Sequence, residues 1–463
     1  MTRDRMMRAR PCRSSGATHF APKIHAGDGD MGMAKSRQAS GRKKAAKNGR
    51  SGQTGRSGRT GRMADTIEEL DGMLAGAGPA EADNEKYWQA VRAQFPYNGS
   101  IHYTNNGTIG ILPHMVLQAQ IAVLKETEIQ DGDTGGVAYP APHEAHEKLA
   151  ALINADPSEV AITRNSTESM NIIALGLDLK PEDEILTTTH EHYGGWSCWQ
   201  HRHAQFGNPI RKLDLYDPPE DEDEIVRLFE EAIRPETRVL SFCHVTCTTA
   251  WRLPVRKICA MARERGLITV VDGAQSVGMI AVDVKDLGGD FYVSSTHKWL
   301  FTPKGTGLLY VDDAAQDKIG LGYYTGGGPP TARRFENNAS QSHAPLVGFA
   351  VAVDFHNAIG TSLVEDRGGA MAKWLKTRLS DIPGVRVWTP MNRALSASMV
   401  SFSIAGMTSS DVGTPLRERY RIHSRGLYEG GYHGARISCA MHNSYEEMER
   451  VAGAVREIAA NRC

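Results

Sequence analysis

The sequence predicts an α/β fold with a large domain, built on a mainly parallel sheet, and a smaller C-terminal α/β domain. From about residue 145, short apolar runs alternate with helical patterns, which is typical of a parallel sheet covered on both faces. Beyond about residue 345, a long helical stretch leads to two or three strands and a last helix. The chain has 463 residues, 40% of them hydrophobic, which is enough for two domains with a large core.

The first segment, residues 1–62, is strongly basic. It carries 16 Lys and Arg against 3 Asp and Glu, whereas the remaining residues carry 37 against 51. Gly, Ser and Arg dominate it without apolar periodicity, so we expect a disordered tail. An alternative interpretation is that the translated protein starts at Met63. A nucleic-acid arm is the other interpretation of such a run, but most charge runs are only solvated, so we expect no nucleic-acid partner.

Residues 63–115 should form an N-terminal helical arm. Helical periodicity runs from Thr66 to Arg92, with a break at the Gly and Pro residues of 76–79. The turn-rich stretch 103–110 contains Asn106 and leads to a further helix near Pro113.

Residues 116–344 should form the large domain. Its strands are expected at 160–163, 185–189, 239–245, 268–271, 291–294 and 307–311, with helices at 168–177 and 255–265. Residues 345–463 should form the smaller C-terminal domain, with helices at 345–359, 371–379 and 445–460.

The cysteine pattern and the hydropathy suggest a cytoplasmic protein. The seven cysteines show no paired spacing for zinc or for a disulfide framework, which is typical of reduced thiols. Cys243 and Cys247 read as core or pocket thiols, and we expect no metal site. No apolar stretch reaches the length of a membrane span, so we expect no membrane contact.

The most informative pair of residues is Asp272 and Lys298. Each follows a short apolar run, and the carboxyl ends of parallel strands are where open α/β sheets bind ligands. Pyridoxal 5′-phosphate (PLP) needs these two groups: the amine forms a Schiff base with the aldehyde, and the carboxylate keeps the pyridine nitrogen protonated. Lys304, in a Pro-Lys-Gly turn, is the competing lysine, and we expect a structural role for it.

At these residues the sequence resembles the class V aminotransferase family of fold-type I PLP enzymes. This family includes cysteine desulfurases and isopenicillin-N-epimerase-like proteins. The resemblance covers roughly residues 85–460 and several separated motifs in the family's order. It implies a PLP-dependent enzyme that acts on a small amino-acid substrate and forms a homodimer, with Lys298 and Asp272 as catalytic residues.

The resemblance also assigns the other cofactor contacts. Gln275 matches the position that bonds the phenolic oxygen of PLP. The turn before the helix at 168–177 should hold the phosphate through its N–H groups and hydroxyls, although a plain helix cap would have the same residues. The implied phosphate contacts are Ser166, Thr167, Ser295, His297 and, from the partner subunit, Ser340.

His192 should stack on the pyridine ring as a catalytic residue. His190 and Tyr193 stay open as alternatives after a shift of one or two residues. Arg436 matches the clamp for the substrate carboxylate, a task that suits the two parallel donors of a guanidinium. We place Asn106 with Arg436 in the substrate-binding set.

The reaction remains open at this point. An epimerase or aminotransferase that removes the Cα proton, similar to isopenicillin-N-epimerase-like proteins, is the first hypothesis. A C–S lyase or cysteine desulfurase is the alternative, but no cysteine lies between Cys259 and Arg436, where desulfurases carry their nucleophile. A non-catalytic scaffold with a nucleic-acid-binding tail is a further alternative.

Overall fold

A computed structural model describes residues 57–97, 99–129, 141–215, 218–320, 331–336 and 341–461. The chain divides into two units after Gly55, and all the described residues belong to the second unit, Arg56–Cys463. The predicted tail therefore lies outside the described residues except at its end, where helix α1 (Ser57–Gly76) begins. The sequence hides this start because Gly and Ser are poor helix formers.

A seven-stranded sheet forms the centre of the fold, in the order β2-β8-β7-β6-β5-β3-β4. β8 runs antiparallel to both its neighbours, and the other pairs are parallel. The predicted mainly parallel α/β fold is therefore confirmed. The strands are β2 (Val160–Thr163), β3 (Glu184–Thr188), β4 (Ile210–Leu213), β5 (Thr237–Cys243), β6 (Ile268–Asp272), β7 (Phe291–Ser294) and β8 (Gly307–Val311).

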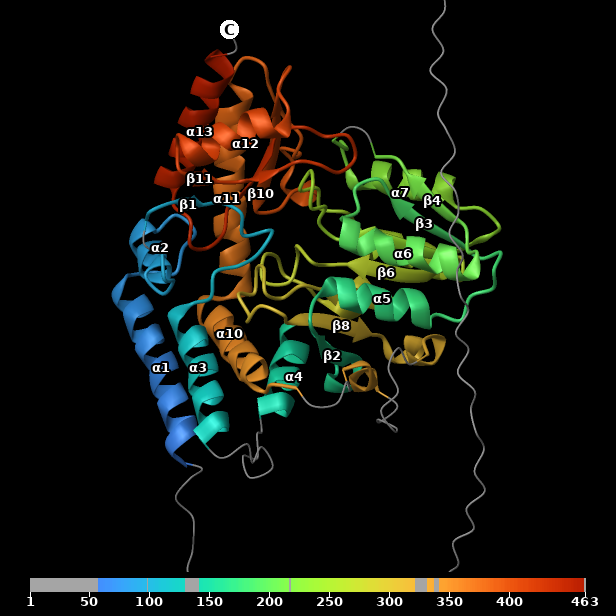
Figure 1. The fold of residues 1–463 in the computed structure, drawn as a ribbon, viewed down its shortest axis with the longest axis horizontal. Helices are drawn as coiled ribbons and strands as arrows, with labels where there is room; N and C mark the ends of the chain where they lie inside the picture. Colours follow the sequence, from blue (N-terminus) through green and yellow to red (C-terminus); the bar gives the residue numbers. More distant parts are fainter. Residues whose placement is uncertain are drawn as a thin grey trace, which may run out of the picture. The chain divides into compact units, whose positions relative to one another are not determined.

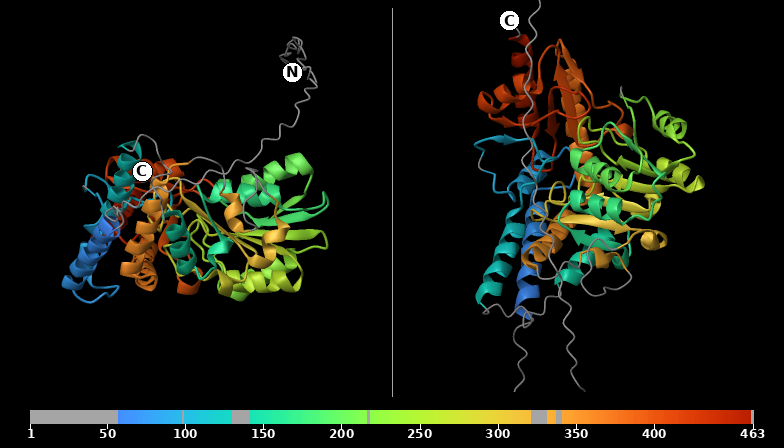
Figure 2. Two further views of the ribbon diagram at one scale, coloured as in Figure 1. Left: turned by 90° about the horizontal axis from the view of Figure 1, so that it is seen from below. Right: turned by 45° about the vertical axis from the view of Figure 1, so that its right-hand side comes forward.

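Successive residues of the central strands enter two different cores, because side chains of a strand alternate between its faces. Val270 packs with α5 (Ser166–Gly176) and α6 (Tyr193–Phe206). Val271 packs in the larger core with α7 (Glu222–Ala232) and α8 (Val255–Glu264). Figure 2 shows helices on both faces of this sheet.

The larger core also includes helices from both ends of the chain (Figure 1). α10 (Ala344–Ile359) contributes Phe349 and Phe355, although the sequence places the start of the C-terminal domain at residue 345. The division into domains stays a prediction. The other helices here are α2 (Glu85–Arg92), α3 (His114–Ile129), α4 (Ala141–Leu152) and α9 (Val284–Leu287), with short turns η1 (Pro157–Glu159), η2 (Asp313–Lys318) and η3 (Ala332–Phe335).

The C-terminal part has its own antiparallel sheet, in the order β12-β13-β10-β9, and its own core. Its strands are β9 (Val385–Val387), β10 (Met399–Ile404), β12 (Arg425–Gly426) and β13 (Ala435–Ser438). Its helices are α11 (Thr361–Ser380), α12 (Ser409–Glu418) and α13 (Tyr445–Ala460), and η4 (Arg393–Leu395) is a short turn.

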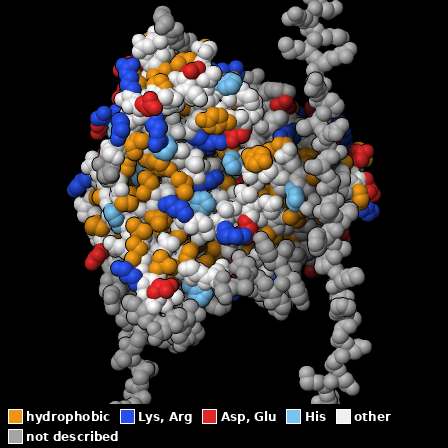
Figure 3. All heavy atoms as spheres, viewed as in Figure 1, with side chains coloured by type: hydrophobic (Ala, Val, Ile, Leu, Met, Phe, Trp, Pro, Cys, Tyr) orange, Lys and Arg blue, Asp and Glu red, His pale blue; other side chains and the backbone are white. Residues whose placement is uncertain are grey.

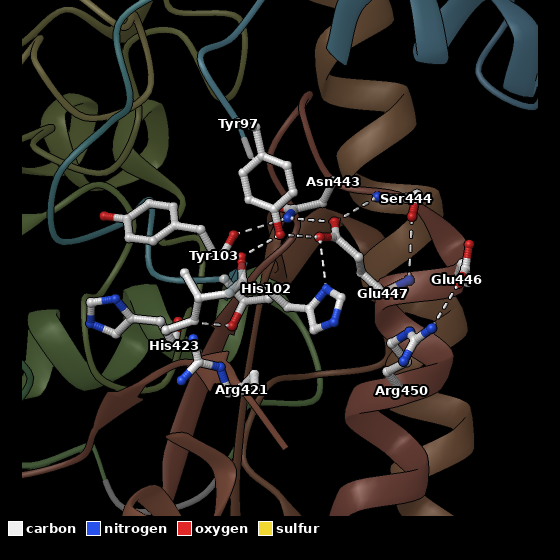
Figure 4. Close-up of polar contacts among 12 residues, drawn as sticks. Tyr97, His102, Tyr103, Arg421, His423, Asn443, Ser444, Glu446, Glu447 and Arg450 are labelled. Carbon is white, nitrogen blue, oxygen red and sulfur yellow. Dashed lines mark hydrogen bonds and ion pairs between the residues drawn. The ribbon is translucent and has the colours of Figure 1, made fainter. Parts of the chain in front are cut away.

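The N-terminal arm is attached to this C-terminal part at two places. β1 (His102–Tyr103) pairs in parallel with β11 (Ile422–His423). At the start of α13, Glu447 accepts hydrogen bonds from Arg92 at 2.7 and 2.9 Å. It also accepts from the Tyr97 hydroxyl at 2.9 Å and from Asn443 at 3.1 Å (Figure 4). The arm and α13 therefore behave as one packed unit.

Among the described residues, no single helix has the length and apolarity of a membrane span. α10 and α11 reach them only as a pair bent by 72°, and α10 is largely buried in the core.

Candidate active site

The candidate residues come together at the carboxyl ends of the parallel strands. Asp272 is the last residue of β6, and Lys298 lies four residues beyond β7. Loops after β3 and β5 supply His192 and Cys247, and β13 of the C-terminal sheet supplies Arg436. This edge is where parallel α/β sheets place their ligands.

Asp272 is buried without a cation partner among the described residues. It is 4% exposed, and its Oδ1 accepts a hydrogen bond from the Ala274 N–H at 2.9 Å. Burial raises the pKa of Asp272, while the Ala274 N–H and the charge of Lys298 act to lower it. A Cβ added to Gly195 would stand 2.8 Å from Asp272 Oδ2, so α6 approaches the carboxyl closely enough to require glycine there.

Lys298 is half-buried, and no described residue accepts a hydrogen bond from its Nζ. Burial lowers the pKa of Lys298, as do the charges of Arg436 and Arg425, whereas Asp272 and Cys247 raise it. A lysine with a lowered pKa is available as a nucleophile and a base. Lys304, by contrast, lies exposed in its turn.

Of the three rings after β3, His192 is the one that faces the site. Its Nδ1 accepts from the Gly194 N–H at 3.1 Å and caps α6. Burial, with the charges of Lys298 and Arg425, lowers the pKa of His192 to about 4, so the ring is neutral at neutral pH. His190 is buried between Thr249 and the Leu215 carbonyl, and Tyr193 is 67% exposed.

Hydroxyl and N–H donors gather at the start of α5. The Ser166 N–H donates to Ser295 Oγ at 3.0 Å, and the two hydroxyls lie 2.9 Å apart. Thr167 Oγ1 lies against Gly194. Asn165 caps the helix by accepting from the Glu168 N–H, so the Ser166 hydroxyl is not occupied in capping. A helix start with such donors binds anions well.

His297 completes this side of the site. Its Nδ1 donates to the Thr306 carbonyl at 2.9 Å, which leaves Nε2 open to a ligand. Ser340 lies outside the described residues, so its contact with the phosphate stays a prediction.

Arg436 is a buried guanidinium without a carboxylate. It is 1% exposed, its Nη1 donates to the Cys247 carbonyl at 2.6 Å and its Nη2 to Thr108 Oγ1 at 3.4 Å. Its Nε is buried with no partner, and no described residue forms an ion pair with it. Burial, followed by the charge of Arg425, lowers the pKa of Arg436. A buried cation without a partner is costly, so the site is suited to an incoming carboxylate.

The loop at 105–108 joins the two halves of the site. Asn106 Nδ2 donates to the Lys298 carbonyl at 3.2 Å, and Gln275 Nε2 donates to the Gly107 carbonyl at 2.7 Å. A Cβ on Gly107 would stand 2.8 Å from Arg436 Nη2. The Asn106 Oδ1 is buried with no partner. Gln275 Oε1 already accepts from Trp299 Nε1 at 2.8 Å, so Gln275 has one N–H left for a ligand.

Sequence reasoning missed Arg425 and Glu429 in the site and gave Cys247 no role beyond that of a core or pocket thiol. Arg425 is the direct cross-strand partner of Arg436 and forms an ion pair with Glu429, whose carboxylate also accepts from Thr248 at 3.3 Å. Cys247 is 4% exposed, and its charge state affects the pKa of Lys298. β12 spans two residues, too few for a periodic signal, so the sequence alone could not have shown this pairing.

The described residues fit the expected cofactor. The buried Asp272 carboxylate can pair with the protonated ring nitrogen of PLP, and the Lys298 amine can react with its aldehyde. The donors at the start of α5 can hold its phosphate. Within the part of the chain described, no three His, Cys, Asp or Glu side chains converge as metal ligands.

Comparison with known proteins gives consistent matches. A family model described as aminotransferase class-V matches residues 110–456. Isopenicillin N epimerase of Streptomyces clavuligerus is 29% identical over 387 residues, which cover 80% of this chain and 97% of that protein. A probable cysteine desulfurase of Mycobacterium leprae is 27% identical over 427 residues, which cover 80% and 96%.

Two solved structures of the cystine C–S lyase C-DES also match. One has glycine covalently linked to PLP and covers 80% of this chain and 98% of its own. The other is a complex with cysteine persulfide and covers 79% and 99%. Each has a TM-score of 0.70 and 25% sequence identity.

Proposed function

Because this chain belongs to the class V aminotransferase family, we propose that it is a PLP-dependent enzyme that removes the Cα proton of an amino acid, as an epimerase or an aminotransferase. The chain is an enzyme, and PLP is its cofactor, so the scaffold alternative is set aside. Among the relatives, isopenicillin N epimerase is the one whose reaction this proposal follows.

The observation that carries the proposal is a buried guanidinium without a carboxylate beside a lysine amine of lowered pKa. Arg436 is buried without a carboxylate, and Lys298 lies close enough for the charge of each to act on the other. A free α-amino acid supplies a carboxylate for Arg436 and places its Cα hydrogen near an amine.

PLP supplies an electron sink for the pair released when a bond at Cα breaks. Asp272 would hold a proton at the ring nitrogen, and Ser166, Thr167 and Ser295 would hold the phosphate. Arg436 would fix the substrate carboxylate and with it the orientation of the Cα–H bond. Lys298 Nζ would take the Cα proton; inversion then requires a proton donor on the opposite face of Cα, whereas transamination requires the proton to be placed on the cofactor instead. The neutral His192 ring would lie against the bound cofactor.

A deuterium experiment tests this function. The enzyme with bound PLP is incubated in D2O with single amino acids and with isopenicillin N, and Cα deuterium and chirality are followed by NMR and chiral chromatography. Exchange with inversion identifies an epimerase, and exchange accompanied by transfer of the amino group to an added oxoacid identifies an aminotransferase. No exchange with any of these compounds would contradict the proposal.

A C–S lyase is the second candidate, and Cys247 favours it. The backbone carbonyl of Cys247 accepts from Arg436, and the charge state of its thiol acts on the pKa of Lys298. The solved structures that match this chain include a cystine C–S lyase. With cystine as substrate, a lyase would release pyruvate, ammonia and cysteine persulfide, whereas an epimerase would not. Coupled assays for pyruvate and sulfide separate the two.

We also propose that the enzyme is a homodimer. Met73 on α1, and Ile121 and Leu124 on α3, are large apolar side chains that are 40 to 49% exposed, and apolar side chains gather over these helices in Figure 3. Such a patch marks a protein interface more often than open surface. Light scattering of Leu124→Glu against the parent tests it: the parent should have the mass of two chains and the variant a lower mass.

A further inference from the structure

A second buried carboxyl group lies next to the cofactor site. Glu191 follows β3 and is 6% exposed. Its Oε1 accepts from the Thr188 hydroxyl at 2.7 Å and from the Cys243 N–H at 3.2 Å, and its Oε2 accepts from the Cys243 thiol at 2.9 Å. All three of these donors are neutral. The proposed mechanism gives this group no role.

Glu191 and Asp272 face the same glycine. Cys243, which bonds Glu191, is the cross-strand partner of Asp272 between β5 and β6. A Cβ added to Gly195 would stand 2.8 Å from Asp272 Oδ2 and 3.9 Å from Glu191 Oε2. No described residue forms an ion pair with either carboxyl. Two buried carboxyl groups in this arrangement cannot both ionise at low cost.

The surrounding charges leave Glu191 as the group that titrates. Burial raises the pKa of Glu191 to about 7; its hydrogen bonds with Cys243 and Thr188 oppose the shift, and the charge of Asp272 adds to it. On the neighbouring elements, burial raises the pKa of the Cys243 and Cys198 thiols, so both stay neutral. On β4, burial lowers the pKa of Lys212, while the charge of Glu191 acts to raise it; the Lys212 ammonium packs over the Trp196 ring and forms no ion pair with Glu191.

We propose that Glu191 is a positioning residue for Asp272. The two carboxyl groups hold one proton between them, and Glu191 carries that proton while Asp272 is ionised against the cofactor's ring nitrogen. The inference rests on the proposed function, because it takes PLP as the ligand of Asp272. When Glu191 also loses its proton, a second negative charge strengthens the hold on the positive ring nitrogen.

The test measures the affinity of the cofactor-free enzyme for pyridoxamine 5′-phosphate between pH 5.5 and 8.5. This compound carries the ring nitrogen and phosphate but no aldehyde, so Lys298 cannot form a Schiff base with it. Glutamine resembles a protonated Glu191 at every pH. We expect Glu191→Gln to match the parent below about pH 6 and to bind about fivefold more weakly above about pH 7.5, since only the parent gains the second charge.

Glu184→Gln is the matched control. Glu184 is also a buried carboxyl, at the start of β3, but Arg211 and Thr237 already satisfy it. Its affinity curve should run parallel to that of the parent. Superimposable curves for Glu191→Gln and the parent would overturn the inference, whereas a parent that does not bind the compound at any pH would overturn the proposed function itself.

A second variant keeps the test usable if Glu191→Gln fails to fold. Cys243→Ala removes the thiol donor that favours the ionised form of Glu191. It should move the rise in affinity to higher pH, and an unchanged midpoint would also overturn the inference.

Discussion

At the scale of single residues, Lys298 and Lys304 give a matched pair. Both are lysines beyond β7, but the charges of Asp272 and Arg436 act on the pKa of Lys298, whereas Lys304 lies exposed in its turn. We expect Lys298→Ala to lose the visible absorbance of bound PLP and nearly all turnover, and Lys304→Ala to keep both. Borohydride reduction followed by peptide mapping locates the attached cofactor; a label that stays in the Lys298→Ala chain would show that another lysine is used.

Arg436 should act on the substrate and not on the cofactor. Arg436→Ala should keep the absorbance of bound PLP and lose about 3 kcal/mol or more of transition-state stabilisation, because a charged hydrogen-bonding partner is deleted. Arg436→Lys should recover little, since an ammonium does not reproduce the two parallel donors. Kinetics with an amino acid and with its decarboxylated amine provide the measurement. If the Ala variant still prefers the acid as strongly as the parent, another group holds the carboxylate.

At the scale of elements, Glu447 fixes the N-terminal arm to α13. Burial acts to raise the pKa of Glu447. The charge of Arg92 and the hydrogen bonds from Arg92, Asn443 and Tyr97 outweigh it and lower the pKa to about 2. Because the pKa of Glu447 is lower in the folded than in the unfolded chain, its ionised form stabilises the fold at pH values above the unfolded pKa of about 4.5. This stabilisation is lost as the pH falls from about 4.5 toward about 2. At pH 7, Glu447→Gln should cost about 2 to 3 kcal/mol of unfolding free energy.

Urea unfolding at pH 7 and at pH 3 provides the check on Glu447. The difference between parent and variant should shrink at the lower pH, because Glu447 is then largely protonated in the unfolded chain. Glu446→Gln is the control, since the neighbouring Glu446 side chain is 78% exposed in a pair with Arg450. A difference that stays constant with pH would mean that the charge of Glu447 is not what stabilises this junction.

Strand prediction succeeded where both faces of a strand are buried. β2, β7 and β8 begin and end where the sequence predicts, because their apolar runs are continuous. β4 was missed because this edge strand is only half-buried and carries Arg211 and Lys212. For the site, spacing and family resemblance indicated Asp272, Lys298 and Arg436. Glu191 and Arg425 depend on contacts across strands and loops, which no local pattern encodes.

At the scale of the whole molecule, the start of the folded chain matters for truncation. α1 begins at Ser57 and its Leu70 and Leu74 enter the larger core. A chain that starts at Ser57 should keep the PLP content and the solution mass of the parent. A chain that starts at Met63 loses the first turns of α1 and should melt at a lower temperature. Calorimetry and light scattering compare the full chain with the two truncated chains. A loss of PLP from the chain that starts at Ser57 would show that residues 1–56 have a structural role.

The loop at 105–108 has a consequence for which compounds the enzyme accepts. On one side of the loop, the Asn106 side chain donates a hydrogen bond to the Lys298 carbonyl. On the other side, the Gly107 N–H donates to the hydroxyl of Ser438, two residues from Arg436. The loop thereby links the segment that carries the Lys298 amine to strand β13, which carries the Arg436 guanidinium. We expect a preference for α-amino acids over β- and γ-amino acids, whose carboxylate lies one or two bonds further from the amino group. Selection by backbone length would then be independent of the side chain.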